Sequence, residues 1–278
     1  MQQQSHRVPE QDARDRSSVR KVLAELGEGI GLITFNQPEK RNAMSVDMWD
    51  ALSDILDAWV NDPQVRVVVL TGAGEKAFVS GADISQFEKS RDTAAAQVEY
   101  DRLISKGRAA LKAFPRPVIA RINGYCLGAG LAIAMLADIR ISSNDSSFGI
   151  PAAKLGIAYG FEGVERLISL VGPAHSSALL LTGERIDAAE ALRIGLVNQV
   201  VSASELNSAV DKVARGIACN APLSVEAMKL TIRQAGLDSD NRDMRAVEMA
   251  FKACFDSEDY QEGRAAFLER RQPIFRGR

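Results

Sequence analysis

The sequence predicts an α/β fold of the α+β type, followed by a region made of helices alone. Up to residue 201, short aliphatic runs alternate with segments whose apolar residues recur at helical spacing, and beyond it only helical spacing occurs. The chain has 278 residues, 46% of them hydrophobic and 25% charged, which is enough to bury a large core. We expect a disordered lead over residues 1–18, an α/β core over 19–201 and a helical region over 202–278.

The first elements of the core are predicted to be a β-hairpin and an amphipathic helix. Val19–Leu26 and Gly29–Phe35 are β-like runs separated by a glycine-containing turn. Ser45 suits the N-cap of a helix over Val46–Asn61, whose apolar residues follow helical spacing, and Pro63 ends that helix.

Three strands and two helices follow in alternation. Val65–Leu70, Val118–Ile122 and Asp138–Ser142 are predicted strands, and the first two have the continuous aliphatic character of strands buried on both faces. Thr93–Ala113 and Leu131–Ala137 are predicted helices. Strands that alternate with helices indicate βαβ units and parallel strands.

The C-terminal region carries only helical patterns. Asn220-Ala221-Pro222 separates the first two helices, because proline suits the first turn of a helix. The four predicted helices are Ser204–Cys219, Pro222–Ala235, Asp240–Phe255 and Glu258–Arg271.

Composition excludes several kinds of site and partner. The 34 Lys and Arg against 36 Asp and Glu give a net charge of −2, so no general basic surface for nucleic acid is expected. Three scattered cysteines predict neither a disulfide framework nor a zinc knuckle, and 2 histidines cannot build a multi-histidine metal site. We expect no metal, no nucleic-acid partner and a reducing compartment.

The apolar segments of the chain do not predict a membrane protein. Residues 1–18 lack the apolar stretch of a secretory signal. The most apolar run, Gly124–Ala137, is too short to cross a bilayer. The sequence therefore predicts a cytoplasmic location and no membrane partner.

Two glycine-rich turns are the most informative local feature. Gly81-Ala82-Asp83 and Gly128-Ala129-Gly130 each follow a predicted strand and lead toward a helix. Backbone N–H groups at such turns are unpaired donors, and two turns that converge would form an oxyanion hole. The alternative is that both are ordinary tight connections. Neither turn matches a P-loop or a dinucleotide-binding pattern.

A series of short motifs runs in order along residues 20–278. The motifs are Asn36-x-Pro38, Asn42-Ala43-Met44, Phe78-x-x-Gly81-Ala82-Asp83-Ile84, Asn123-Gly124-Tyr125-x-Leu127-Gly128-x-Gly130, Ala137-Asp138, Phe148-Gly149, Leu155-Gly156-Ile157, Leu181-Thr182-Gly183, Gly195-Leu196-Val197 and Glu262-Gly263-x-x-Ala266-Phe267-Leu268-Glu269-x-Arg271. With these motifs the chain resembles the enoyl-CoA hydratase/isomerase (crotonase) superfamily. The resemblance implies a crotonase-like ββα spiral core with a C-terminal helical trimerisation region. It also implies an acyl-CoA substrate, with coenzyme A as part of that substrate and no separate cofactor, and a homotrimer or dimer of trimers.

The same resemblance implies positions for the substrate. The N–H groups of Ala82 and Ala129 would hold the thioester oxygen, and alanine at either position keeps that N–H. Phe267 and Arg270 would reach coenzyme A from a neighbouring subunit. Further positions implied for coenzyme A are Lys40, Arg41, Ala43, Gly81, Asp83, Ile84 and Gly128.

The catalytic positions are where the chain departs from the hydratases it resembles. Those hydratases carry two glutamates at the positions occupied here by Ala132 and Ala152. Alanine can neither accept a proton from water nor donate one to C2. The usual hydration mechanism is therefore not expected.

Tyr159 is the predicted catalytic side chain. It aligns with a tyrosine of methylmalonyl-CoA decarboxylase, which the chain also resembles locally at residues 256–263. Loss of CO₂ from a malonyl-type thioester needs no base, because the electrons flow into a thioester enolate that one donor then protonates at C2. Alternatively, Tyr159 only packs its ring.

The favoured interpretation is a decarboxylase-like acyl-CoA lyase, and three alternatives stay open. One is an enoyl-CoA hydratase or isomerase that uses other acid and base groups. Another is a pseudoenzyme that binds acyl-CoA without turnover. The third, an RNA-binding member of the superfamily, is disfavoured because the relevant helix has only Lys106, Arg108 and Lys112, in a net acidic chain.

Overall fold

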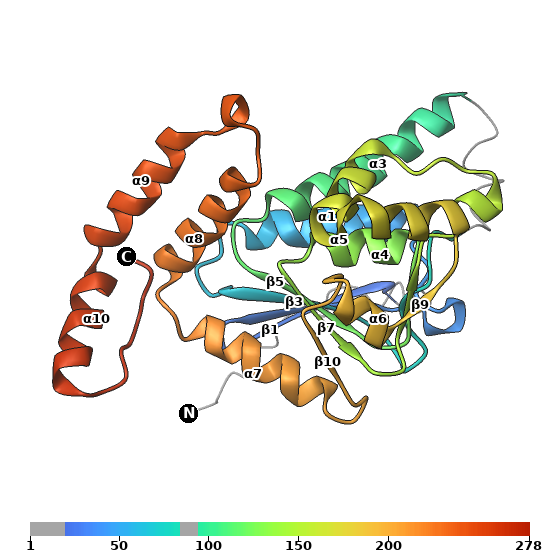
Figure 1. Cartoon of the computed structure of the whole chain (residues 1–278). Helices are drawn as coiled ribbons and strands as arrows, with labels where there is room; N and C mark the ends of the chain where they lie inside the picture. Colours follow the sequence, from blue (N-terminus) through green and yellow to red (C-terminus); the bar gives the residue numbers. More distant parts are fainter. Residues whose placement is uncertain (1–19, 84–93) are drawn as a thin grey trace, which may run out of the picture.

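The computed structural model describes residues 20–83 and 94–278, and within them the core is built on a six-stranded sheet (Figure 1). Its strand order is β1-β2-β3-β5-β7-β10. The β1–β2 pair is an antiparallel hairpin, and the other neighbours are parallel. The strands are β1 (Val22–Gly27), β2 (Ile30–Phe35), β3 (Val67–Gly72), β5 (Val118–Ile122), β7 (Ile139–Ser143) and β10 (Gln199–Val201).

Helices cover both faces of this sheet. On one face, α1 (Val46–Trp59) places Met48, Leu52 and Leu56 in the larger apolar core, together with buried residues of the helices that follow it. On the other face, α7 (Leu206–Ala218) packs Leu206, Val210 and Ala214 against side chains of β3, β5 and β7. The remaining helices of the larger core are α3 (Ala94–Ala113), α4 (Ala129–Leu136), α5 (Phe161–Thr182) and α6 (Ala188–Arg193).

A second, smaller sheet carries the two glycine-rich turns. Its strand order is β4-β6-β8-β9, of which the first three strands are parallel. β4 leads directly into residues 81–83, and β6 leads into the start of α4. The strands are β4 (Ala77–Val79), β6 (Tyr125–Leu127), β8 (Ser147–Gly149) and β9 (Ile186–Asp187).

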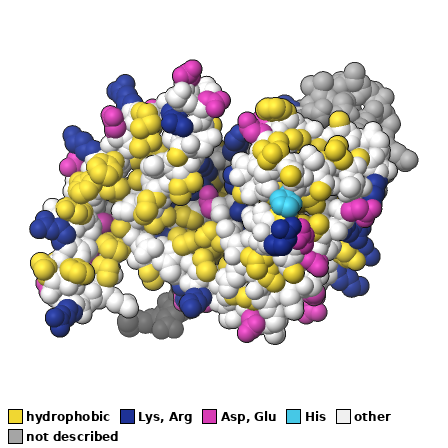
Figure 2. Space-filling view, in the orientation of Figure 1, with side chains coloured by type: hydrophobic (Ala, Val, Ile, Leu, Met, Phe, Trp, Pro, Cys, Tyr) yellow, Lys and Arg dark blue, Asp and Glu magenta, His cyan; other side chains and the backbone are white. Residues whose placement is uncertain are grey.

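Three C-terminal helices extend to one side of the core (Figure 1). They are α8 (Pro222–Ala235), α9 (Met244–Phe255) and α10 (Glu258–Glu269). The Lys229 ammonium ties α8 to the core, because its Nζ lies 2.6 Å from the Asp138 carboxylate. Hydrophobic side chains gather over these helices in Figure 2, and Phe251 and Phe267 are 64% and 84% exposed.

The elements that the sequence predicted are present, apart from their ends, but the second sheet, β10, α5 and α6 were not predicted. The hairpin, the parallel strands and the four C-terminal helices are confirmed. The strand predicted from Val65 begins at Val67, and the helix predicted from Leu131 already begins at Ala129. Ser45 does occupy the N-cap position of α1, but its hydroxyl makes no capping hydrogen bond.

The helices and strands described above do not test the predicted domain boundaries. The lead over residues 1–18 lies outside the described residues. The boundary between core and helical region at residue 201 stays a prediction, and α7, just beyond it, packs on the sheet. In the part of the chain that the structure describes, no helix is long and apolar enough to span a membrane.

Candidate functional site

The first glycine-rich turn is held in place by the segment before α1. The Met44 N–H donates to the Gly81 carbonyl at 2.8 Å, and the Asp83 N–H donates to the Met44 carbonyl at 2.9 Å. This bridge uses the groups on either side of Ala82 and leaves its N–H without a partner among the described residues. Ala82 therefore presents a fixed, unpaired donor.

The second turn places the start of α4 directly on β4. A Cβ on Gly130 would lie 2.1 Å from the Val79 carbonyl oxygen, so only glycine permits this approach. The Gly128 N–H donates to the Gly149 carbonyl at 2.9 Å, which fixes the turn from its other side. Ala129 is the first residue of α4, and within the described chain its N–H has no acceptor.

The two turns meet. A Cβ on Gly128 would lie 3.8 Å from the Gly81 Cα, so the backbones that carry Ala82 and Ala129 are neighbours. The helix dipole of α4 adds positive potential at Ala129. Two unpaired N–H groups on neighbouring backbones suit the stabilisation of a negatively charged oxygen, and the oxyanion hole itself stays a prediction.

Asn42 holds the loop over residues 37–43 beside the first turn. Its side chain is fully buried and accepts a hydrogen bond from the Gln37 N–H at 3.0 Å. Its Nδ2 donates to the Ala73 and Ala77 carbonyls at 2.9 and 2.8 Å. The sequence analysis named Asn42 only as part of a motif. Its backbone is left-handed, with φ of 56°, and asparagine adopts this conformation more readily than most residues. The residue type was therefore the available signal.

The predicted coenzyme A positions in the first half of the chain do lie together. The Lys40 Nζ is 2.8 Å from an Asp83 carboxylate oxygen, and this hydrogen bond raises the pKa of Lys40. The Arg41 guanidinium lies over the Tyr125 ring, 5.2 Å from its centre. Ala43, half-buried, follows in the same loop. Ile84 lies outside the described residues.

Tyr159 lies just before α5 with its hydroxyl turned inward. Its ring packs on Gly163, where a Cβ would lie 2.5 Å from a ring carbon. The ring is partly accessible, but the hydroxyl oxygen is buried and has no hydrogen-bond partner. Burial raises the pKa of Tyr159 to about 12, and the charge of Arg108 opposes this rise. At neutral pH the hydroxyl therefore keeps its proton.

Other predicted positions are less central or lie elsewhere. Ala132 is buried in α4, and Ala152 lies half-buried before the short 3₁₀ helix Ala153–Leu155. Phe267 and Arg270 lie at the end of α10, far from the two turns within one chain (Figure 1). Asp138 accepts a hydrogen bond from the Val118 N–H at 2.7 Å, as expected for a structural carboxylate.

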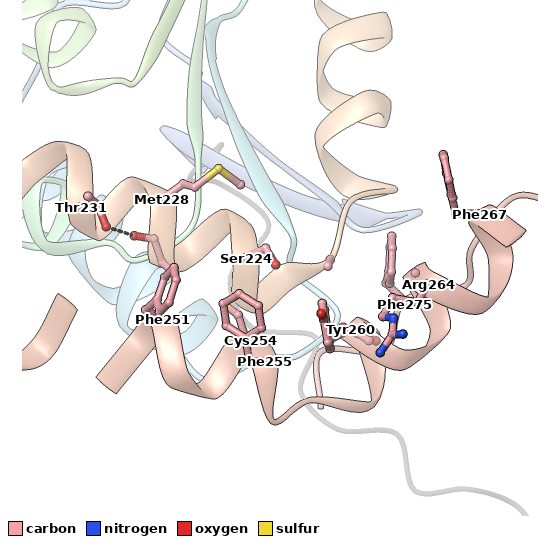
Figure 3. A pocket seen from close by; sticks show the side chains of 14 residues that line it. Ser224, Met228, Thr231, Phe251, Cys254, Phe255, Tyr260, Arg264, Phe267 and Phe275 are labelled. Carbon is pink, nitrogen blue, oxygen red and sulfur yellow. Dashed lines mark hydrogen bonds between the residues drawn. The ribbon is translucent and has the colours of Figure 1, made fainter. Parts of the chain in front are cut away.

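An apolar hollow lies apart from this site. It has a volume of about 630 Å³ and lies between α8, α9 and α10, lined by side chains such as Met228, Phe251 and Phe255 (Figure 3). Neither glycine-rich turn contributes to it. In residues 20–83 and 94–278, no group of three His, Cys, Asp or Glu side chains could hold a metal ion.

Comparison with known proteins places this geometry in a family. The family model Enoyl-CoA hydratase/isomerase matches residues 25–278. The chain is 40% identical over 252 residues to the short-chain-enoyl-CoA hydratase of Clostridium acetobutylicum, covering 90% of this chain and 95% of the relative. It is 38% identical over 255 residues to the crotonyl-CoA hydratase of Syntrophomonas wolfei, covering 91% and 97%.

Solved structures agree. The crystal structure of an enoyl-CoA hydratase/carnithine racemase from Magnetospirillum magneticum matches with a TM-score of 0.88 and 34% identity. That match covers 94% of this chain and 97% of the other. The likeness therefore extends over both the core and the C-terminal helices.

Proposed function

This chain belongs to the enoyl-CoA hydratase/isomerase family, and on that premise we propose that it binds an acyl-CoA thioester and stabilises its enolate. The observation that carries the proposal is the meeting of the two turns that carry the unpaired N–H groups of Ala82 and Ala129. When electrons flow into a thioester, negative charge develops on its carbonyl oxygen. Donors fixed in advance stabilise that charge more than they stabilise the neutral substrate.

Hydration of an enoyl-CoA is the reaction that the names of the relatives support. The oxygen of water bonds to C3 and gives up one proton to solvent water, the π electrons of the C2=C3 bond move into the enolate, and C2 then takes a proton. Tyr159 is our candidate for that proton donor, because its hydroxyl is protonated and buried. The names of the relatives therefore favour the hydratase alternative over the decarboxylase that the sequence reasoning put first.

Decarboxylation remains a second candidate because of one specific observation. Hydration also needs a group that takes a proton from water, and Ala132 and Ala152 cannot do so. In decarboxylation the C–C bond electrons pass to C2 as CO₂ leaves, and only a proton donor is required. The same oxyanion turns and Tyr159 serve either reaction.

The remaining contacts of the substrate are proposed from the family resemblance. Residues of the loop over 38–43, together with Gly81, Asp83 and Gly128, would contact coenzyme A. Phe267 and Arg270 would complete the site from a second copy of the chain, in a trimer or dimer of trimers. Their exposure on α10 is compatible with a role of this kind.

The test is the product formed from a panel of acyl-CoA esters. Crotonyl-, methylmalonyl- and ethylmalonyl-CoA are incubated with the enzyme and analysed by mass spectrometry. Gain of one water by crotonyl-CoA supports the hydratase, and loss of CO₂ from a malonyl ester supports the decarboxylase. Binding without any change of mass would leave the isomerase and the pseudoenzyme, and absence of binding would contradict the proposal as a whole.

A further inference from the structure

The helix α4 carries the Ala129 N–H but has no polar side chain of its own. Its eight residues are alanine, glycine, leucine, isoleucine and methionine, and those from Gly130 to Met135 are buried. Apolar contacts are non-directional, so they keep the helix in the core but specify its exact position less sharply than hydrogen bonds do. The directional contacts that fix α4 are therefore made by its backbone.

Two arginines from other elements bind the C-terminal end of α4. The Arg166 Nε donates to the Met135 carbonyl at 2.7 Å, and the Arg140 Nη1 donates to the Ala137 carbonyl at 2.6 Å. The last carbonyls of a helix have no partner within the helix and carry partial negative charge, so guanidinium groups suit this end. Arg140 is buried and Arg166 is half-buried, so water competes little for these bonds.

Arg166 differs from Arg140 in the element that carries it. Arg140 lies on β7 and ties α4 to the central sheet. Arg166 lies in the second turn of α5, whose first turn packs on the Tyr159 ring. Within the described residues, its bond to Met135 is the one hydrogen bond between α4 and α5. Arg166 thus joins the helix that carries the oxyanion donor to the helix that follows the proposed proton donor.

The direction of the bond decides which movement it opposes. Carbonyls of a helix point along its axis, so a bond to the Met135 carbonyl opposes movement of α4 along that axis. The close approach of Gly130 to Val79 instead limits how near α4 lies to β4. A helix of eight residues is only about 12 Å long, so a shift at one end is passed on to the other.

We infer that Arg166 is a positioning residue, which fixes α4 so that the Ala129 N–H lies where the thioester oxygen binds. This inference rests on the proposed function, because it takes that N–H to be an oxyanion donor. Arg166 acts through α4 and not by contact with the substrate. A displacement of about 1 Å at a reacting group can lower the rate by up to about 10²-fold. Loss of the bond to Met135 should therefore reduce the polarisation of the thioester.

Arg233 offers a matched control for a purely structural role. Like Arg166 it is half-buried, and its Nη2 donates to the Phe114 carbonyl at 2.7 Å, just beyond the end of α3. Neither glycine-rich turn lies on α3. Removal of either arginine takes a donor from the C-terminal end of a helix, but only Arg166 binds the helix that carries Ala129.

The test is the infrared C=O stretch of bound butyryl-CoA that is labelled with ¹³C at the thioester carbonyl. Arg166→Met keeps an aliphatic side chain and removes the donor, whereas Arg166→Lys keeps the charge and one donor group. Arg233→Met is the control, and Ala129→Pro, which removes the N–H itself, is made alone and together with R166M. Melting temperatures and the affinity for free coenzyme A are measured for every variant.

The C=O frequency should fall when the ester binds wild type and fall less in R166M, with R166K between the two. For an ester that the enzyme turns over, kcat/KM should fall about 10-fold in R166M, while free coenzyme A binds unchanged. R233M should lower the melting temperature but leave the frequency as in wild type. Adding R166M to A129P should change the frequency no further, because both changes act on one donor.

Three results would overturn the inference and leave the proposed function intact. A wild-type frequency in R166M would make Arg166 structural only. An equal effect of R233M and R166M would indicate general loosening of the fold, and a further change in the double variant would show that Arg166 acts by another route. The proposed function itself fails if A129P gives the wild-type frequency or if no acyl-CoA binds. Should R166M not fold, R166K and Arg166→Gln carry the same comparison.

Discussion

The two ends of the proposed site are built from different parts of the polypeptide. The thioester end is proposed to depend on backbone N–H groups in two turns whose positions are fixed by hydrogen bonds and close backbone packing. The acyl end is proposed to depend on the side chain of Tyr159, whose hydroxyl is buried and has no hydrogen-bond partner. A backbone N–H survives most substitutions, so Ala129 keeps the donor that glycine would supply. A side-chain group does not, so we expect replacement of Tyr159 to change the reaction.

The largest effect is expected where the backbone donor itself is removed. Ala129 is the first residue of α4, a position that tolerates proline, so Ala129→Pro should keep the helix while deleting the N–H. The catalytic efficiency, kcat/KM, should fall about 10²- to 10³-fold, as for loss of an oxyanion donor. Ala129→Ser, which keeps the N–H, is the control. Equal activity of A129P and A129S would show that this donor is not used.

A somewhat smaller effect is expected from the proton donor at the acyl end. Tyr159→Phe removes the hydroxyl and leaves the ring on Gly163, so kcat should fall about 10²-fold with little change in stability. Tyr260→Phe, which alters a tyrosine on α10, is the matched control. Unchanged kcat in Y159F would assign Tyr159 to packing, the alternative that the sequence left open.

The pH dependence of kcat/KM and of stability tests whether the Tyr159 hydroxyl is buried in the folded protein. Because burial raises the pKa of Tyr159 to about 12, kcat/KM should show no loss with a midpoint near pH 10, the ordinary value for tyrosine. The folded state holds this proton longer than the unfolded state, so stability should fall as pH rises from about 10 to about 12. Urea titrations of wild type and Y159F measure that difference. An activity midpoint near 10 in wild type, absent in Y159F, would contradict the buried hydroxyl.

The smallest effect is expected at the rim of the thioester end. Lys40 is 47% exposed in its pair with Asp83, and exposed pairs contribute little. Lys40→Met should weaken the affinity for acyl-CoA only about 2- to 5-fold, through one lost phosphate contact. Raising the salt concentration should reduce the difference between the variants. A loss as large as that of A129P would mean that Lys40 is part of the oxyanion turn.

The sequence predicts the thioester end better than the acyl end for a physical reason. The turns at 81–83 and 128–130 are local, since glycine, the preceding strand and the following helix are all neighbours in the chain. Their convergence still needed the structure, in which β4 and β6 pair in parallel. The sequence left open whether Tyr159 only packs its ring, because the burial of its hydroxyl depends on segments distant in sequence.

The ends of helices and strands were predicted less well for a similar reason. Val65 and Leu131 have the apolar character of the elements next to them, but ladder and helical hydrogen bonds decide where each element starts. The missed role of Asn42 arises from contacts with Gln37, Ala73 and Ala77. The bonds to Ala73 and Ala77 join segments more than 30 residues apart in the chain, and no local pattern encodes them.

The central claim is that two backbone N–H groups hold the thioester oxygen. It is tested most directly by the infrared C=O stretch of butyryl-CoA labelled with ¹³C at the thioester carbonyl. Hydrogen bonds from Ala82 and Ala129 polarise this bond, so its frequency should fall when the ester binds wild type or A129S, and fall less in A129P. A frequency equal to that of the free ester in water, or the same in A129P and A129S, would contradict the account.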